Sequence, residues 1–398
     1  MLIESGYVMN LQKCIDDLAT LVAFDTTSHR SNKPLIDWVA GRLEGLGYRV
    51  MVQQAPDEDK ANLFASIGPE DQGGLMLSAH ADVVPVAGQN WRTDPFKLHQ
   101  DAGRLYGRGS ADMKGFIACM LQAAPGFAAA RLKAPVHLAL SYNEETNMGG
   151  MKQLAAALRD SSYTPKACVI GEPTSMQVVV ANKGAAIYRF KVRGFEVHSS
   201  LRDQGVSAVE AAAQIIVRSQ QIQERMRKDL RHDGFEFPFS SIHVGRIAGG
   251  TAHNITAKDC EFMLEIRALP GRAAAPFIGE LKHWCEAELL PTMRAIAEPS
   301  NIEIEEITDS PSLDEQGNAR LARAMMPLCA CHALGRVSFG TEGGILQQVG
   351  IPTIICGPGQ INVAHQADEY VEISQLKLCL DYLEHLRVQL EHDPACFF

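Results

Sequence analysis

The sequence of 398 residues lacks the segments that direct a chain to or through a membrane. No apolar run is long enough to span a bilayer, and residues 1–6 contain neither the basic nor the apolar segment of a secretory signal. The ten cysteines are scattered and include no Cys-x-x-Cys pair. We therefore expect no membrane partner, and we expect free thiols in a protein of the reducing cytoplasm.

The sequence is also poor in the features of nucleic-acid and nucleotide binding. Lys and Arg number 37 against 47 Asp and Glu, and the net charge of −10 argues against nucleic acid or an anionic membrane as a partner. No Walker A loop is present, and Gly107-Arg108-Gly109 does not continue into a dinucleotide fingerprint. The Gly-x-Ser-x-Gly elbow of many serine hydrolases is absent as well.

The length and the apolar content of 46% allow two domains with sizeable cores. Up to residue 180, buried strand patterns alternate with helical patterns, which predicts an α/β fold with a mostly parallel mixed sheet flanked by helices. Residues 181–309 have the order β-α-β-β-α-β of a ferredoxin-like unit, which we interpret as an α+β domain inserted into the first. The first domain resumes over 310–398, beginning with a helix over about 316–331.

Residues that suit metal binding follow the ends of the predicted strands of the first domain. Acidic residues at strand ends are often merely solvated, but the carboxyl ends of parallel strands share one edge of a sheet, so we expect these side chains to converge. Two imidazoles and several carboxylates suit zinc, and two metals would need one shared carboxylate. The candidate residues are His80, Asp112, Glu144, Glu145, Glu172 and His365.

Five motifs in this order resemble those of the dinuclear zinc aminoacylase and carboxypeptidase family. They are His80-Ala81-Asp82, Gly109-Ser110-Ala111-Asp112-Met113-Lys114-Gly115, Glu144-Glu145, Gly171-Glu172-Pro173-Thr174 and Ala364-His365-Gln366. Further segments are similar to the acetylornithine deacetylase branch of that family. These segments are Trp91-Arg92-Thr93-Asp94-Pro95-Phe96, Leu105-Tyr106-Gly107, Thr341-Glu342, Gly357-Pro358-Gly359 and His365-Gln366-Ala367-Asp368-Glu369-Tyr370.

The resemblance implies a role for each residue of the first domain. Residues 1–180 and 310–398 would form the catalytic, metal-binding domain. Two divalent metal ions would be bound, with zinc favoured and cobalt as the alternative. Asp82 would orient the His80 ring, Glu144 would be the general acid and base, and the Asp112–Met113 peptide bond would be cis. The first metal would be held by His80, Asp112 and Glu172, and the second by Asp112, Glu145 and His365.

The resemblance also implies that residues 181–309 form a lid and dimerisation domain. His198 would enter the active site of the neighbouring subunit in a homodimer, while Asn254 and Arg267 would contact the substrate. The residues leave simpler interpretations open, because His198 could cap a turn and Arg267 could form an ion pair at the end of a strand. We expect the strand before His198, over 186–192, to be of the edge type.

The implied reaction is hydrolysis of an N-acyl amino acid, with N-acetyl-L-ornithine as the favoured substrate and a place in arginine biosynthesis. N-succinyl amino acids such as succinyl-diaminopimelate, other N-acyl amino acids and dipeptides are alternative substrates. A different alternative is a non-catalytic homologue that only binds an amino-acid derivative. The intact Glu144 argues against that alternative, because a binding protein has no use for a base beside the ligand Glu145.

Overall fold

The computed structural model describes residues 8–70, 73–159, 161, 163–329 and 331–398. The chain divides into two compact units. Unit 1 comprises Met1–Ala181, Leu313–Arg336 and Thr341–Phe398, and unit 2 comprises Asn182–Ser312 and Val337–Gly340. Unit 1 therefore contains every predicted metal ligand, and unit 2 contains His198, Asn254 and Arg267.

The large sheet has the strand order β1-β2-β6-β3-β7-β14-β8-β13 within the described residues. Its strands are β1 (Arg49–Gln54), β2 (Ala61–Ile67), β3 (Leu75–His80), β6 (Val136–Ser141), β7 (Ala167–Ile170), β8 (Val179–Asn182), β13 (Gly335–Val337) and β14 (Thr353–Ile355). The central strands β6, β3, β7 and β14 run parallel, whereas β1, β2 and β8 join antiparallel to their neighbours. Every residue of β3, β6 and β7 is buried, as expected for strands covered on both faces.

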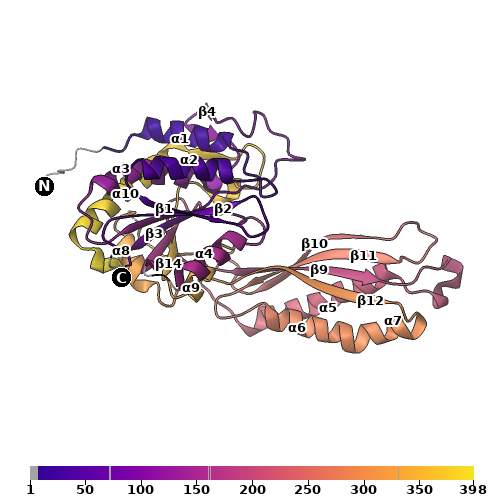
Figure 1. Ribbon diagram of the computed structural model, residues 1–398. Helices are drawn as coiled ribbons and strands as arrows, with labels where there is room; N and C mark the ends of the chain where they lie inside the picture. Colours follow the sequence, from indigo (N-terminus) through magenta and orange to yellow (C-terminus); the bar gives the residue numbers. More distant parts are fainter. Residues whose placement is uncertain (1–7, 71–72, 160, 162, 330) are drawn as a thin grey trace. The chain divides into compact units, whose positions relative to one another are not determined.

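Helices cover both faces of this sheet (Figure 1). They are α1 (Leu11–Ala23), α2 (Lys33–Glu44), α3 (Gly115–Ala129), α4 (Gly149–Arg159), α8 (Ala319–Met325), α9 (Gly343–Gln348) and α10 (Ile373–His392). The helix α3 packs against α1 and α10, and α4 packs against α9. A small sheet combines β4 (His99–Asp101), β5 (Arg104–Tyr106) and β15 (Tyr370–Glu372). This architecture confirms the predicted α/β class.

The helix α8 is much shorter than the predicted helix over 316–331. It starts after Gly317, which has a left-handed φ of 89°. It ends at Met325, two residues before Pro327. Met326 still has helical backbone, but Pro327 cannot donate an N–H to the carbonyl four residues before it and its ring crowds that carbonyl, so the apolar pattern beyond Met325 does not continue the helix.

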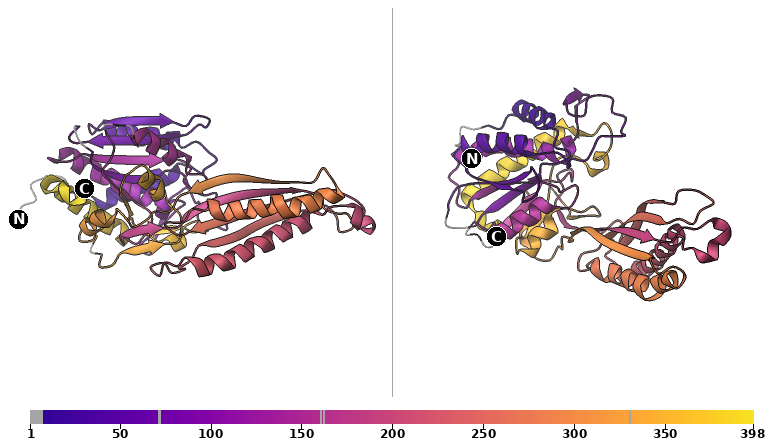
Figure 2. Two further views of the ribbon diagram at one scale, coloured as in Figure 1. Left: turned by 90° about the horizontal axis from the view of Figure 1, so that it is seen from below. Right: turned by 45° about the vertical axis from the view of Figure 1, so that its right-hand side comes forward.

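Unit 2 has the chain order β9 (Gly184–Arg193), α5 (Ala208–Asp229), β10 (Ser241–Gly249), β11 (Asp259–Ala268), α6 (Ala275–Trp284), α7 (Leu290–Ile296) and β12 (Asn301–Ser310). Its sheet has the order β10-β11-β9-β12 with antiparallel neighbours. Figures 1 and 2 show α5 beside α6 and α7 on one face of this sheet. The β-α-β-β-α-β order and this topology confirm the predicted ferredoxin-like α+β unit.

The expectation that the strand before His198 is of the edge type is wrong. That strand is β9, which pairs with β11 on one side and with β12 on the other, so the edges are β10 and β12. Charged and apolar residues alternate along β9, and this alternation resembles that of a half-exposed strand at the edge of a sheet. Lys191 instead lies on the face of the sheet without helices and forms ion pairs with Glu303 and Glu305 of β12, at 3.3 and 3.1 Å.

Candidate metal centre

The predicted ligands lie at one edge of the large sheet. His80 is the last residue of β3, and the strands β6 and β7 on either side of it run parallel to β3 and lead to Glu145 and Glu172. Glu172 follows Gly171, where a Cβ atom would lie 1.9 Å from the Phe116 ring of α3. Only glycine therefore lets the end of β7 approach α3 this closely.

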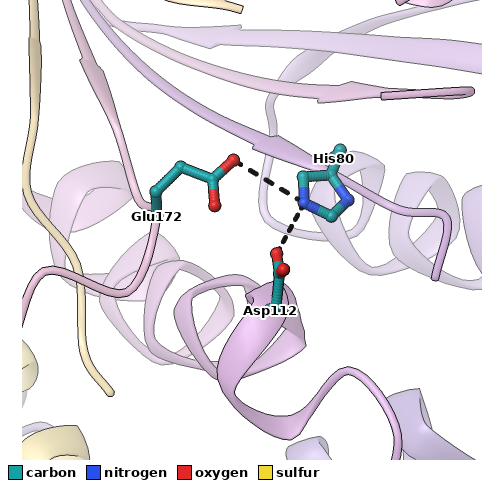
Figure 3. A group of neighbouring side chains, drawn as sticks. All are labelled: His80, Asp112 and Glu172. Carbon is teal, nitrogen blue, oxygen red and sulfur yellow. Dashed lines mark hydrogen bonds and ion pairs between the residues drawn. The ribbon is translucent and has the colours of Figure 1, made fainter. Parts of the chain in front are cut away.

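The first group of side chains consists of His80, Asp112 and Glu172, which point toward one another (Figure 3). The Nε2 atom of His80 lies 2.9 Å from Oδ1 of Asp112 and 3.7 Å from Oε1 of Glu172. All three residues are buried. One imidazole nitrogen and two carboxylates at this spacing form a donor set that suits zinc.

The second group shares Asp112 with the first. His365 places its Nε2 atom 3.1 Å from Oδ2 of Asp112 and 3.0 Å from Oε2 of Glu145. The two oxygens of Asp112 thus face different imidazoles, Oδ1 toward His80 and Oδ2 toward His365. A carboxylate in this position can bridge two metal ions, which is the shared ligand that a dinuclear site requires.

The backbone has unusual conformations at this site. The Asp112–Met113 peptide bond is cis, which confirms the feature implied by the family resemblance. Asn143, directly before Glu144, and His365 both have a left-handed φ, of 59° and 61°. The Lys60 ammonium donates hydrogen bonds to the Asn143 side chain and to the Ser28 carbonyl, so a buried cation holds the loop that carries Glu144 and Glu145.

The electrostatics of the two groups favour a bound cation. Burial, together with Asp112, raises the pKa of Glu145 to about 7, and burial raises the pKa of Glu172 well above its usual range. Hydrogen bonds to Asp112 and Glu145 raise the pKa of His365 to about 11. Without a cation, these buried carboxylates are stabilised by protons or by imidazolium groups. Divalent metal ions would supply the same positive charge, so the residues present fit a metal pair.

Asp82 lies against the His80 ring with its main chain and its side chain, and Oδ1 of its carboxylate is 3.8 Å from Nδ1 of His80. The His80 ring is oriented by the main chain of Asp82, since Nδ1 of His80 lies 3.0 Å from that carbonyl oxygen and must donate to it. This hydrogen bond leaves Nε2 of His80 free as a metal ligand. The Asp82 carboxylate also accepts from the main-chain N–H groups of Glu144 and Glu145, at 3.0 and 3.3 Å, and from the Ser28 hydroxyl at 2.6 Å.

Glu342 is a site residue that the sequence analysis named only as part of a similar segment. It is buried, and its carboxylate accepts a hydrogen bond of 2.6 Å from the hydroxyl of Ser141, the last residue of β6. Burial raises the pKa of Glu342 to about 7, and the charges of His80 and Asp82 also act on it. In the sequence, Glu342 stands out only as part of the Thr341-Glu342 pair. That pair does not have the spacing of a metal-binding or catalytic motif.

The candidate residues of unit 2 have local partners. His198 is exposed and caps the helical turn Ser199–Gln204, because its Nδ1 atom accepts from the Ser200 N–H. The Asn254 carbonyl accepts from the Ser199 N–H at 2.9 Å, so Asn254 lies next to His198. Arg267 of β11 forms an ion pair of 2.6 Å with Glu265. The structure therefore brings His198 and Asn254 together and gives Arg267 an acidic partner on its own strand.

An α/β sheet with this paired cluster at the carboxyl edge of its strands suits a metal-dependent enzyme. The chain belongs to Peptidase family M20/M25/M40, which matches residues 76–388. The family inferred from the five motifs is thus confirmed. Within the described residues, no helix has the length and apolar character needed to cross a membrane.

Relatives share much of the sequence with this chain, and solved structures share its fold. The chain is 35% identical over 367 residues to an acetylornithine deacetylase of Myxococcus xanthus, covering 91% of this chain and 93% of the relative. It is 32% identical over 372 residues to one of Yersinia pseudotuberculosis, covering 92% and 93%. An M20 family metallo-carboxypeptidase of Sulfolobus solfataricus has the same fold, with a TM-score of 0.77, 16% identity and coverage of 95% and 99%. A dinuclear metal binding peptidase of Bacillus subtilis gives a TM-score of 0.65 at 16% identity, covering 95% and 97%.

Proposed function

We propose that this protein removes the acetyl group from N-acetyl-L-ornithine, with L-ornithine and acetate as products, in arginine biosynthesis. The observation that carries the proposal is the pair of ligand groups that share Asp112, with Glu144 directly beside the ligand Glu145. The substrate follows from the acetylornithine deacetylases of Myxococcus xanthus and Yersinia pseudotuberculosis, whose similarity extends over more than nine-tenths of each chain.

Two zinc ions, or cobalt in their place, are the metals that we propose for the site. His80, Asp112 and Glu172 would hold one ion, and Asp112, Glu145 and His365 would hold the other. When bound, such a pair supplies an acidified water and polarises the amide carbonyl. We place the reaction in a reducing cytoplasm, because all ten cysteines are free thiols.

Glu144 is the proposed general base and general acid. It accepts a proton from the attacking water and returns it to the leaving amine. The Asp82 carboxylate holds the main-chain N–H groups of both Glu144 and Glu145, so the base and the neighbouring ligand have one common anchor. In this proposal Asp82 fixes the distance between the base and the metal pair, while its carbonyl orients the His80 ring.

For unit 2 we propose the role of a lid and dimerisation domain. His198 of one subunit would stabilise the developing oxyanion in the other subunit of a homodimer. Arg267 would bind the substrate carboxylate through the paired donors of its guanidinium, and Asn254 would contribute a further polar contact. Residues 1–180 and 310–398 would then be the catalytic domain.

The experiment that tests the proposal is a hydrolysis panel with purified protein. The substrates are N-acetyl-L-ornithine, other N-acetyl amino acids, N-succinyl-diaminopimelate and a dipeptide, each with and without a chelator. We expect the highest kcat/KM for N-acetyl-L-ornithine, loss of turnover after chelation, and recovery with zinc or cobalt. A higher kcat/KM for another substrate would overturn the substrate assignment. A metal-loaded protein that hydrolyses none of the panel would favour the alternative of a binding protein.

A further inference from the structure

A buried ion pair lies beside the candidate metal centre and is not part of either ligand group. Nη1 of Arg108 lies 2.6 Å from Oε2 of Glu369, and each side chain is only 1% exposed. Glu369 belongs to a segment that resembles the family, whereas Arg108 appears in the sequence only as part of Gly107-Arg108-Gly109, and the proposed mechanism gives neither of them a role. The surroundings of the pair indicate what it does.

The Glu369 carboxylate binds the backbone of the loop that carries Asp112. Its Oε2 atom accepts from the Gly109 N–H at 3.0 Å, in addition to Arg108. Its Oε1 atom accepts from the N–H groups of Ala111 at 3.0 Å and of Asp112 at 3.1 Å. Burial raises the pKa of the Glu369 carboxyl, whereas Arg108 and the amides of Gly109 and Asp112 oppose that shift. One buried side chain thus fixes the main chain at the shared metal ligand.

The Arg108 side chain connects this loop to the loop of His365. Its Nη2 atom donates a hydrogen bond of 2.6 Å to Oε1 of Gln89, and the amide nitrogen of Gln89 donates one of 2.8 Å to the main-chain carbonyl of His365. The Trp91 indole N–H also donates to Oε1 of Gln89, and the Trp91 ring lies 5.1 Å from the Arg108 guanidinium. These contacts form a continuous path from the Asp112 loop to the His365 loop that does not pass through a metal.

A purely stabilising role does not explain this arrangement. A buried ion pair contributes little net stability compared with apolar residues of similar size, because both charges lose their hydration. Here the Glu369 carboxylate accepts from the backbone of the Asp112 loop, and Nη2 of Arg108 leads through the Gln89 side chain to the main chain of the His365 loop. Within the described residues, the Nε atom of Arg108 has no hydrogen-bond partner. Hydrogen bonds of this kind orient ligands and raise the affinity of a metal site.

We propose that Gln89, Arg108 and Glu369 are positioning residues that set the separation of Asp112 and His365, and hence the affinity of the second metal position. This inference rests on the proposed metal-binding role of Asp112, Glu145 and His365. The set Gln89, Arg108 and Glu369 is called the clamp below.

The test uses the full-length protein after removal of metal, titrated with zinc or cobalt against a competing chelator. In Glu369→Gln, one of the two metals should bind about 10–100-fold more weakly, and the visible spectrum of the cobalt-loaded protein should change. Gln89→Leu keeps the buried pair but removes the hydrogen bonds of Gln89 with Arg108, with Trp91 and with the His365 carbonyl, so it cuts the link between the two loops. It should weaken the same metal by about tenfold, at the low end of that range. Because Gln89 is only half-buried, this variant tests the clamp even if Glu369→Gln does not fold.

The matched control is Glu391→Gln, which removes a carboxylate from another buried arginine. Arg387 is 3% exposed and pairs with Glu391 at 2.7 Å within α10. This variant should lose thermal stability and yet bind both metals as the wild type does. Wild-type affinities in both Glu369→Gln and Gln89→Leu would overturn the clamp while leaving the proposed function intact. If the wild-type protein binds no divalent metal at all, the proposed function and the clamp are both wrong.

Discussion

Unit 1 and unit 2 hold their candidate functional residues in opposite ways. In unit 1, His80, Asp112 and Glu172 are buried, and His80 lies within hydrogen-bonding or ion-pairing distance of both carboxylates. In unit 2, His198 is exposed and caps a helical turn, and Arg267 pairs with a glutamate of its own strand. The first arrangement is rare for charged side chains, whereas the second is common on protein surfaces.

This difference shows how far geometry alone can assign a role. Burying several carboxylates at one place costs free energy unless positive charge compensates them, so their convergence in unit 1 needs a specific explanation, which a metal pair provides. The residues of unit 2 need no such explanation, because their local partners account for their positions. The metal centre is therefore inferred from structure, and the roles in unit 2 depend on experiments that separate function from local pairing.

The largest effect is expected for the adjacent residues Glu144 and Glu145, which have different roles in the proposal. Glu144→Gln removes the base and leaves the ligands in place, so kcat should fall by about 10²–10⁴-fold with both metals still bound. Glu145→Gln removes a ligand, so the affinity of the second metal should fall. Elemental analysis and steady-state kinetics of both variants provide the measurements.

The opposite pattern would contradict this assignment. If Glu144→Gln loses metal while Glu145→Gln keeps both ions and loses turnover, the base and the ligand have been exchanged. Both residues share the Asp82 anchor through their main-chain N–H groups, so the two variants are matched in their backbone support. Differences between them should therefore arise from the side chains alone.

The next largest effect is expected for His198 of unit 2. If its imidazole acts as an oxyanion donor, His198→Ala should lower kcat by about 10²–10³-fold without changing the metal content. Ser200→Ala is the control, because it removes a hydroxyl 2.8 Å from His198 Nδ1 and leaves the ring present. If His198→Ala keeps the wild-type kcat, His198 does not act as an oxyanion donor and only caps its helical turn.

Mixing two variants tests whether His198 acts between subunits. A homodimer of His198→Ala and a homodimer of Glu144→Gln should both be nearly inactive. A heterodimer should regain one competent site, which combines Glu144 of one chain with His198 of the other. If exchange of subunits is verified by mass and no activity returns, His198 does not act in the neighbouring subunit.

Some features of the fold and the site could be predicted from the sequence, and others could not. The strand ends at His80 and Glu172 follow from local apolar patterns and from the rule that parallel strands share a carboxyl edge. Glu342 and Glu369 escaped that reasoning, because their contacts cross 201 residues to Ser141 and 257 residues to Asp112. No periodicity in the sequence records such distant pairings.

Local patterns also misled in two places. The apolar pattern over 316–331 predicts one helix, but Pro327 has no N–H to continue the helix hydrogen bonds, and the helix ends at Met325. The charged residues of β9 predict an edge strand, but they lie on the helix-free face of an interior strand. For β9 the pattern gives the exposure of the side chains correctly and leaves the neighbouring strands undetermined, whereas for the helix it overlooks a local proline.

The smallest effect is expected for Arg267, where the functional and the local interpretation are closest. Glu265 lies two residues before Arg267 in β11, so both side chains are on the same face of the strand, and their ion pair measures 2.6 Å. The Arg267 side chain is 33% exposed, so the pair itself should contribute at most about 1 kcal/mol to the free energy of unfolding.

Two variants distinguish the interpretations. Arg267→Lys keeps the positive charge and can still pair with Glu265, but it loses the planar fork that binds a carboxylate through two hydrogen bonds. Glu265→Gln removes the ion pair and leaves the guanidinium. If Arg267 binds the substrate carboxylate, Arg267→Lys should raise KM by about tenfold, equivalent to about 1.4 kcal/mol, while Glu265→Gln leaves KM unchanged.

A substrate whose carboxylate is replaced by a carboxamide completes the test. Arg267→Lys should leave the KM of this analogue unchanged, because the paired contact to the carboxylate is already missing in the wild type. The result against substrate binding has two parts. Arg267→Lys would have the wild-type KM for both substrates, and Arg267→Lys and Glu265→Gln would show small and similar losses of stability. Arg267 would then have no role beyond its ion pair with Glu265. In that case, substrate recognition has to come from residues other than Arg267.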